Sequence, residues 1–331
     1  MEHTPERIRV SLGTAAALGL KRIRVDADST TAYLMSYTEQ PCAGNCAFCA
    51  QARNSIGDHS QLSRVLWPDY QTDEVLSALN VHSGSVRRIC IQVINYPGFI
   101  TDVTTLIQAI RSSSSLPVSV DTCPIKRRDF LAFKKAGAEK VGVPIDAATP
   151  TLFDSIKGRS AGGPYRWEAH LAALKTAKKI FGPENVMTNL IVGLGETERE
   201  AVEFIQTQMD NGIKTALFAF TPLRGTSMEK CAPPSLSSYR RIQLARYLIT
   251  AGATRYESMK FSPNGKLTSF GTNAPLLNIV GDGEAFRTSG CPDCNRPYYN
   301  ERPRGPMYNY PRPLKPAEAV EEIKKMEVEK S

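Results

Sequence analysis

The chain has 331 residues, of which 41% are hydrophobic and 22% charged, and this balance excludes a wholly disordered protein. Its length is large for an ordinary single domain but suits one α/β barrel. The formal net charge of +8 comes from scattered Lys and Arg residues, without a basic block interleaved with aromatic residues. We therefore expect no nucleic-acid partner, and we interpret the charge as steering toward an acidic protein or an anionic cofactor.

The sequence also bears on the compartment. It contains no stretch that approaches the roughly 20 apolar residues of a membrane helix. The first residues, MEHTPERIRV, lack the apolar core of a signal peptide. These observations predict a cytoplasmic protein with no membrane partner. Eight cysteines in a reducing compartment indicate metal or catalytic chemistry more than disulfides.

Short β-prone runs alternate with helical stretches, which predicts a parallel sheet. The expected strands are residues 32–37, 88–94, 117–121, 140–143, 186–192, 216–220, 256–261 and 284–288. The clearest expected helices are residues 129–136, 167–180, 198–209 and 235–251. Thr197 is a plausible N-cap for the third of them, and Gly252 follows the last. Eight strand–helix units predict an α/β fold of the (β/α)8 TIM-barrel type.

The chain after Gly290 differs in composition, being rich in Pro, Tyr, Asn and Arg. It is too aromatic for a typical disordered tail, so we expect an ordered, extended segment over the barrel, followed by a short charged helix. The expected organisation is an N-terminal extension over residues 1–30, a barrel over 31–290, and a C-terminal cysteine-pair segment and tail over 291–331.

Three cysteines, Cys42, Cys46 and Cys49, follow the first expected strand with the spacing C-x3-C-x2-C. The loops after the strands of a barrel form its active-site face. Three thiolates in one tight loop can hold three irons of a cubane cluster, and the fourth iron then keeps an open position for a ligand. The alternatives are buried structural cysteines or a structural zinc site, which normally takes four protein ligands, commonly as two pairs.

This loop, with the aromatic Phe48 before its third cysteine, resembles the signature of the radical S-adenosylmethionine (SAM) superfamily. The resemblance implies a [4Fe-4S] cluster on the three cysteines, with SAM chelated to the open iron. Reductive cleavage of SAM would give a 5′-deoxyadenosyl radical that removes hydrogen from an unactivated carbon. Phe48 would then contact adenine; its alternative role is ordinary loop packing.

A second segment, NLIVGLGET over residues 189–197, is similar to the G-x-I-x-G-x-x-E motif of that superfamily, with Asn189 in place of the first glycine. In this comparison Asn189, Ile191 and Glu196 belong to the SAM site, and Ile191 lies against adenine. The alternative is a tight strand-to-helix turn with Glu196 near a helix N-terminus, where the helix dipole favours a carboxylate.

Four more cysteines form a second candidate set. Cys90 lies in the second expected strand, Cys123 ends the third, and Cys291 and Cys294 form a C-x2-C pair after the last. Barrel closure places the last strand beside the first, so all four can meet at one cavity and hold an auxiliary [4Fe-4S] cluster. The alternatives are small buried hydrophobes for the two strand cysteines and a zinc site for the pair. Cys231 is assigned no role.

Over roughly residues 31–289 the chain resembles biotin synthase, whose auxiliary cluster has cysteine ligands at positions matching Cys90 and Cys123. The third cysteine position falls at about Met187 and the arginine ligand falls near Lys260. Cys291 and Cys294 could replace these two ligands. That pattern resembles the archaeal-type, two-component lipoyl synthases, which carry two [4Fe-4S] clusters.

Further SAM contacts follow from the same resemblance. Tyr96 matches the position where relatives bind the SAM amino group through backbone carbonyls. Asp146 survives from an otherwise replaced asparagine-rich motif and is a ribose ligand, or alternatively a helix N-cap. Arg159 or Arg166 could pair with the SAM carboxylate, although solvated arginines are the plainer reading.

The resemblance implies insertion of sulfur at C6 or C8 of an octanoyl chain. The implied partners are an octanoylated lipoyl carrier protein or domain, a second radical SAM protein, and an electron donor such as ferredoxin. Three alternatives stay open. The first is biotin synthase-like sulfur insertion into dethiobiotin. The second is a radical SAM isomerase, lyase or methylase, and the third is a non-enzymatic iron–sulfur or zinc-binding module.

Overall fold

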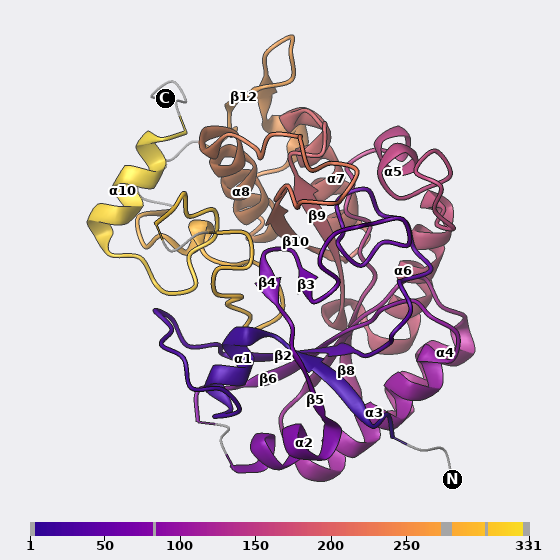
Figure 1. Cartoon of the computed structure of the whole chain (residues 1–331). Helices are drawn as coiled ribbons and strands as arrows, with labels where there is room; N and C mark the ends of the chain where they lie inside the picture. The colour runs from indigo at the N-terminus through magenta and orange to yellow at the C-terminus, as the bar shows by residue number, and fades with distance from the viewer. Residues whose placement is uncertain (1–3, 82–83, 273–279, 302–303, 327–331) are drawn as a thin grey trace.

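The computed structural model describes residues 4–81, 84–272, 280–301 and 304–326. Its main sheet is mostly parallel and is surrounded by helices (Figure 1), which confirms the expected α/β fold of the TIM-barrel type. Six strands of this sheet are parallel and adjacent in chain order: β2 (Thr31–Ser36), β6 (Arg88–Gln92), β7 (Val118–Asp121), β8 (Ala138–Gly142), β9 (Val186–Val192) and β10 (Lys214–Ala219).

Two antiparallel strands extend the sheet beyond β2. They are β1 (Arg7–Val10), which pairs with β2, and β5 (Asp69–Gln71), which pairs with β1. Strand β1 lies in the region expected as an N-terminal extension. Ile8 and Val10 are buried and alternate with the more exposed arginines, so the period-2 pattern of a half-buried strand was present in the sequence.

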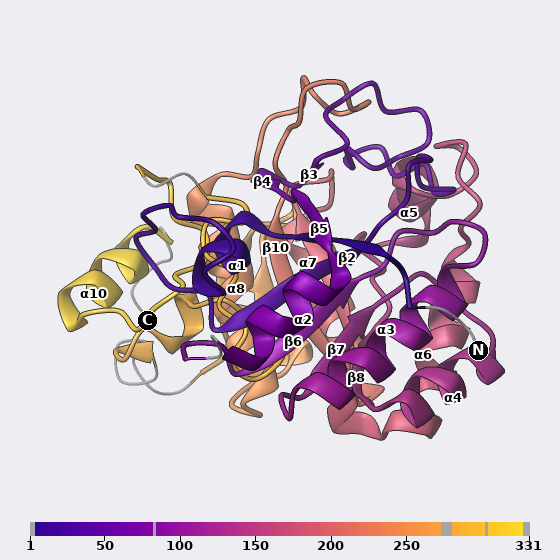
Figure 2. The same ribbon diagram turned by 60° about the horizontal axis from the view of Figure 1, so that its bottom comes forward.

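Helices follow most of the parallel strands and cover the outside of the sheet (Figures 1 and 2). Thr197 caps the helix after β9 as expected, because its hydroxyl accepts from the Glu200 backbone N–H while the Glu200 carboxylate accepts from the Thr197 N–H at 2.7 Å. The helices are α1 (Leu12–Ala17), α2 (Thr72–Val81), α3 (Phe99–Ser113), α4 (Arg127–Ala136), α5 (Pro150–Ile156), α6 (Trp167–Phe181), α7 (Glu198–Asp210), α8 (Leu236–Thr250) and α10 (Pro316–Lys324).

The last two expected strands do not join this sheet. Residues 256–261 contain a 3-10 turn, Tyr256–Ser258, and the two-residue strand β11 (Lys260–Phe261), which pairs with β12 (Leu267–Ser269) in a separate sheet. An inner parallel strand has apolar side chains on both faces. This run cannot form one, because Glu257 and Lys260 are polar and exposed. Residues 284–288 begin as a 3-10 turn, Glu284–Phe286, in which two successive side chains are buried instead of alternate ones.

Part of the C-terminal segment links the two ends of the parallel array. Ser289 accepts a hydrogen bond from the Leu217 N–H of β10 at 2.8 Å, and the Asp293 carbonyl accepts from the Thr31 hydroxyl of β2 at 3.0 Å. Arg296 lies over the Phe218 ring of β10, 3.8 Å from its centroid. This segment, instead of two further strands, therefore connects β10 to β2.

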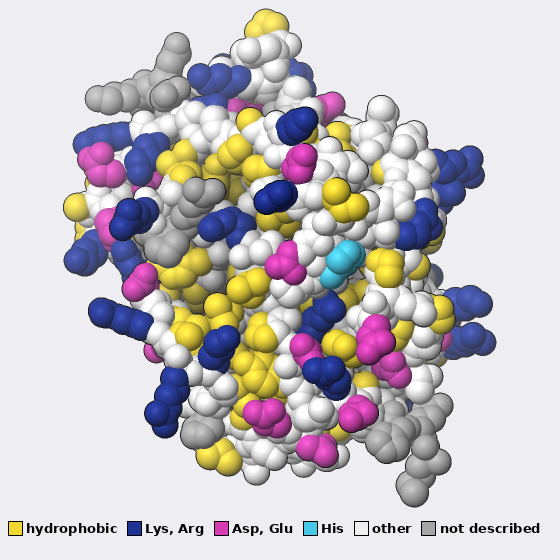
Figure 3. Space-filling model, in the orientation of Figure 1, with side chains coloured by type: hydrophobic (Ala, Val, Ile, Leu, Met, Phe, Trp, Pro, Cys, Tyr) yellow, Lys and Arg dark blue, Asp and Glu magenta, His cyan; other side chains and the backbone are white. Residues whose placement is uncertain are grey.

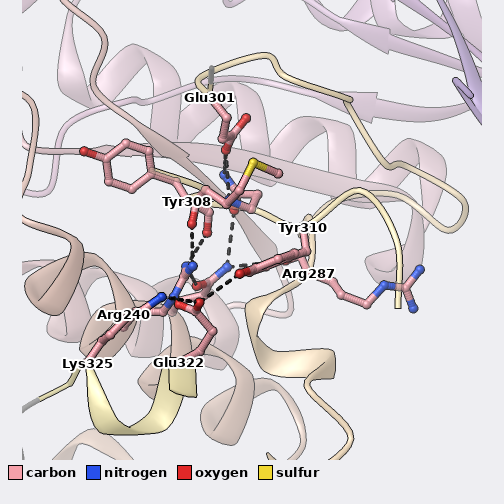
Figure 4. A network of polar contacts seen from close by, with 10 residues as sticks. Arg240, Arg287, Glu301, Tyr308, Tyr310, Glu322 and Lys325 are labelled. Carbon is pink, nitrogen blue, oxygen red and sulfur yellow. Dashed lines mark hydrogen bonds and ion pairs between the residues drawn. The ribbon is translucent and has the colours of Figure 1, made fainter. Parts of the chain in front are cut away.

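A buried polar network fixes the rest of the C-terminal region to α8 (Figure 4). The Arg240 side chain of α8 donates to Glu322 of α10 at 2.7 Å and to the carbonyl oxygens of Met307 and Tyr308. Tyr310 also donates to Glu322, at 2.8 Å.

Among the described residues, no helix combines the length and the apolar character needed to cross a bilayer.

Candidate active site

One cavity inside the barrel brings together every cysteine that the sequence singled out. Its lining includes Cys42, Cys46, Cys49, Cys90, Cys123, Cys291 and Cys294, all of them free thiols. The lining also includes four of the six residues predicted to contact SAM, namely Phe48, Asp146, Asn189 and Ile191. Cys231, which was assigned no role, is exposed on the surface.

The loop after β2 presents the three cysteines of the C-x3-C-x2-C motif. The Cys42 sulfur accepts from the Gly44 N–H at 3.3 Å, and the Cys49 N–H donates to the Cys46 carbonyl at 3.0 Å. A Cβ on Gly44 would lie 2.8 Å from the Tyr165 ring, so this glycine lets the loop pack against Tyr165. Burial raises the pKa of Cys46 to about 12 and also raises that of Cys49.

An apolar wall adjoins this loop. Phe48 and Ile191 both pack against a buried cluster that contains Ile156, Leu194 and Phe220. Phe48 comes from the cysteine loop and Ile191 from β9, so two distant parts of the sequence supply one surface. This surface suits a flat apolar ligand such as an aromatic base.

Asp146 follows β8 with a φ of 71° and is held between β8 and β9, since its N–H donates to the Asn189 carbonyl at 2.9 Å. Its carboxylate accepts from the Lys157 ammonium at 2.6 Å, and both side chains are buried. The N-cap of α5 is Thr149, so the alternative role of Asp146 as an N-cap is wrong.

Lys157 is a cavity residue that the sequence analysis missed. Burial acts to lower its pKa, but the Asp146 carboxylate together with the Cys46 and Cys123 thiols outweighs burial, and the pKa is raised. Its ammonium also donates to the Pro144 carbonyl at 2.9 Å. Nothing in the local sequence distinguishes this lysine from a solvated one, because its burial depends on the turn that follows α5. Arg159 is exposed, and Arg166 donates to the Gly163 carbonyl at 3.2 Å.

Cys90, Cys291 and Cys294 lie together deeper in the cavity. The Cys291 sulfur is 3.5 Å from the Ser119 hydroxyl and the Cys294 sulfur is 3.4 Å from the Tyr33 hydroxyl. Both hydroxyl-bearing residues lie opposite Cys90 on the neighbouring strands. Met187, the position expected for a third strand cysteine, contacts Cys291 with 3.3 Å between the two sulfur atoms.

The arginine position of the biotin synthase comparison is filled differently from the expectation. Lys260 is exposed on β11 and does not line the cavity. Arg296 is half-buried and lines it, and donates to the Ser289 carbonyl at 2.6 Å. The sequence contained one signal for this role, since Arg296 comes two residues after the C-x2-C pair. A segment that brings the pair to the cavity also brings Arg296 there.

Polar side chains separate the two cysteine groups. Gln92 donates to Asp121 at 3.4 Å across β6 and β7, and both residues line the cavity together with Asn189. Burial raises the pKa of Asp121. A Cβ on Gly142 of β8 would lie 1.7 Å from a carboxylate oxygen of Asp121, so only glycine leaves room for this side chain.

Replacing Gly142 with Ala should therefore displace Asp121 and destabilise the barrel by about 1–3 kcal/mol, the usual cost of overpacking. Urea denaturation of the metal-free protein measures the change. Gly84→Ala is the matched control, because a Cβ there meets no atom within 4 Å. Equal unfolding midpoints for the two variants would show that Asp121 moves aside without strain.

A family model described as the radical SAM superfamily matches residues 40–207, half of the chain, including the C-x3-C-x2-C loop and the NLIVGLGET segment. The chain belongs to the radical SAM superfamily. Membership implies a radical SAM enzyme that uses a [4Fe-4S] cluster and SAM. No curated protein matches the sequence.

Solved structures of other proteins share the fold. Methylornithine synthase (PylB) has a TM-score of 0.52 and 14% identity, with 72% of this chain and 67% of that chain covered. The FeFe-hydrogenase maturase HydG from Carboxydothermus hydrogenoformans has a TM-score of 0.53 and 16% identity, with 72% and 56% covered. The chain thus spans little more than half the length of HydG. At these identities the likeness shows the fold alone.

The radical SAM loop fits the cluster that the family implies. Its three cysteines are half-buried and come from one loop, and the Cys42 sulfur accepts a backbone N–H. Within the described ranges, no three His, Cys, Asp or Glu side chains form a site for a single metal ion. A cubane places its cysteines on different irons, so their sulfurs need not converge on one point.

Two of the predicted SAM contacts have side chains outside the cavity lining. The carboxylate of Glu196 accepts from the N–H groups of Gly193 at 2.6 Å and Leu194 at 3.0 Å, and so holds the turn between β9 and α7. This geometry is the tight-turn alternative of the sequence analysis. The Tyr96 hydroxyl donates to Asp102 of α3 at 2.8 Å, which directs the ring away from the cavity and leaves only backbone atoms for a ligand.

Proposed function

We propose that this radical SAM enzyme inserts sulfur into an unactivated C–H bond, at C6 or C8 of a protein-bound octanoyl chain. The observation that carries the proposal is the meeting of two cysteine groups in one cavity, one from the loop after β2 and one completed by the C-terminal pair. When bound, SAM and its cluster supply a carbon radical, and a second [4Fe-4S] cluster supplies sulfide as a consumed reactant.

The residues of the chain bind and orient SAM. Phe48 and Ile191 offer an apolar surface for adenine, and Asp146 offers a carboxylate for the ribose hydroxyls. Lys157 has three ammonium donors, of which the Asp146 carboxylate and the Pro144 carbonyl take two. The third can bind the carboxylate of SAM, while the buried surroundings strengthen each of these contacts.

Lys157→Met should weaken SAM binding, because it removes the buried cation and leaves Asp146 unpaired. We expect at least a tenfold rise in the dissociation constant, the scale of one charged hydrogen bond. Equilibrium dialysis with radiolabelled SAM on the reconstituted protein gives the value. The double variant Asp146→Asn, Lys157→Met avoids the unpaired charge, and Lys214→Met at an exposed ion pair is the control. Unchanged affinity in the double variant would exclude both residues from the SAM site.

The rest of the cavity suits an aliphatic substrate carried by an acidic protein. Apolar side chains that line it include Leu62, Val65, Trp67, Phe220 and Leu223. Burying each methylene of an octanoyl chain contributes about 0.8 kcal/mol. The net charge of +8 favours association with an acidic carrier domain. On the face shown in Figure 3, Lys and Arg side chains are scattered over the edges and the middle and do not form one stripe of the kind that tracks a nucleic-acid backbone.

The test uses the full chain, reconstituted anaerobically with iron and heavy-isotope sulfide. It is given SAM, a reductant or ferredoxin, an octanoylated lipoyl carrier peptide and the paired radical SAM protein of the same pathway. We expect peptide that has gained heavy sulfur, detected by mass spectrometry. SAM cleavage without any sulfurated product would contradict the proposal and favour isomerase, lyase or methylase chemistry.

One observation favours a second candidate, sulfur insertion into dethiobiotin. The polar side chains of Gln92, Asp121 and Asn189 lie between the two cysteine groups, and their donors and acceptors suit a cyclic urea. The same assay with dethiobiotin in place of the carrier peptide distinguishes the two substrates.

A further inference from the structure

The strand register places one row of side chains deep in the barrel. Tyr33 of β2 is the register partner of Cys90 of β6, and Cys90 is the partner of Ser119 of β7. All three line the cavity. Since register partners on parallel strands lie at the same height and face the same side of the sheet, Cys90 stands between the hydroxyls of Tyr33 and Ser119.

The C-terminal cysteine pair contacts the two outer residues of this row. Cys291 is 3.5 Å from the Ser119 hydroxyl and Cys294 is 3.4 Å from the Tyr33 hydroxyl, measured from sulfur to oxygen. The two sulfurs therefore lie on either side of Cys90. A turn fixes the pair, because the Cys294 N–H donates to the Cys291 carbonyl at 3.1 Å and the Asp293 carbonyl is held by Thr31 at 3.0 Å.

Cys123 is at a different height. It comes four residues after Ser119, and β7 ends two residues before it. At about 3.3 Å per residue, the end of β7 at Asp121 already lies roughly 7 Å beyond Ser119 toward the carboxyl ends of the strands, and Cys123 follows in the loop beyond that end. Gln92 and Asp121, which are register partners, lie between the two heights.

We propose that Cys90, Cys291 and Cys294 hold the second [4Fe-4S] cluster without Cys123, so that one of its irons has no cysteine ligand. This corrects the four-cysteine set expected from the sequence, and it rests on the second cluster of the proposed function. The iron without a cysteine is open to a non-cysteine ligand. The side chains that contact the three sulfurs are the Gln92 amide, 3.2 Å from Cys90, the Met187 thioether, 3.3 Å from Cys291, and the hydroxyls of Tyr33 and Ser119, at 3.4 Å from Cys294 and 3.5 Å from Cys291. A cluster with one weakly held iron is easier to dismantle than a fully thiolate-bound one, as a sulfur donor requires.

The test needs a chain in which only the second cluster can form. Replacing Cys42, Cys46 and Cys49 with Ala removes the first cluster, and iron and acid-labile sulfide are then counted after anaerobic reconstitution. We expect about four irons per chain, as for one cubane. Adding Cys123→Ala should leave this count unchanged, whereas adding Cys90→Ala or Cys291→Ala should reduce it at least fourfold. Adding Cys231→Ala, at the exposed cysteine, sets the baseline.

Three further outcomes are decisive. If Cys123→Ala loses iron as fully as Cys90→Ala, the three-cysteine set is wrong while the proposed function stands with four cysteines. If the triple variant binds no iron, the second cluster is absent and the proposed function itself fails. If Cys90→Ala and Cys291→Ala retain all the iron, these cysteines are not ligands. Near-ultraviolet circular dichroism of each metal-free variant separates loss of a ligand from loss of the fold.

Discussion

Cys46→Ala is expected to abolish SAM cleavage. A radical SAM cluster on Cys42, Cys46 and Cys49 would lose one of its three thiolates. The neighbours of Cys46 offer no replacement, since Ala47 has no ligand atom and the Asn45 carboxamide is bonded to the Ala161 carbonyl and the Asn54 N–H. With a proposed second cluster intact, the iron content should fall from about eight to about four per chain. The release of 5′-deoxyadenosine under strong reductant, measured by liquid chromatography, should drop to the background of the buffer.

Two controls make this result specific. Cys231→Ala removes a thiol from the surface and should leave both iron and 5′-deoxyadenosine unchanged. Cys291→Ala should lower iron to a similar extent but keep SAM cleavage, because its sulfur lies beside Ser119 and Met187, away from the loop. If Cys46→Ala still released 5′-deoxyadenosine at the rate of the unaltered chain, the loop would not be the site of SAM cleavage.

Local patterns explain why the first six strands were predictable. The run from Val186 to Val192 is apolar at both ends and is followed directly by Gly193, so adjacent residues indicate both the strand and the turn. The C-x3-C-x2-C loop is equally local, since its chemistry depends only on spacing. Such features can be read from a window of a few residues, which is why they agreed with the structure.

The last part of the barrel depends on contacts between distant residues. Ser289 meets Leu217 across 72 positions, and Asp293 meets Thr31 across 262. No periodicity in residues 284–297 shows that this segment would run along β10 and β2 instead of forming strands. The expected eighth strand failed for this reason, although the C-terminal cysteines still reached the cavity.

The same limit applies to the site. Cys123 and Cys90 look alike in the sequence, each on or after a strand, and only the pairing of Cys90 with Ser119 shows their difference in height. Lys157 and Arg296 become cavity residues through a turn and through the C-terminal segment, respectively. Sequence patterns gave the candidate ligands, whereas their division into groups required the register of the sheet.

Arg240→Met is expected to have the largest effect on stability. Arg240 and Glu322 are fully buried, with side chains 0% and 2% exposed, and Arg240 also donates to two backbone carbonyls of the C-terminal region (Figure 4). Removing one partner of a buried ion pair typically destabilises a protein by about 3–5 kcal/mol. Glu322 keeps an ion pair with Lys325 at 2.6 Å, whose side chain is 45% exposed, so we expect a loss near the lower end of this range. Urea denaturation of the metal-free chain, followed by circular dichroism, measures the free energy of unfolding.

The chain offers a matched pair for comparison. Arg312 and Glu318 also form an ion pair in the C-terminal region, but their side chains are 50% and 31% exposed. Arg312→Met should therefore cost at most about 1 kcal/mol. The double variant Arg240→Met, Glu322→Leu should recover part of the loss, because no buried charge is then left unpaired. Equal destabilisation by Arg240→Met and Arg312→Met would show that the buried network does not fix the C-terminal region to α8, and the placement of Cys291 and Cys294 would then have to depend on Ser289, Asp293 and Arg296 alone.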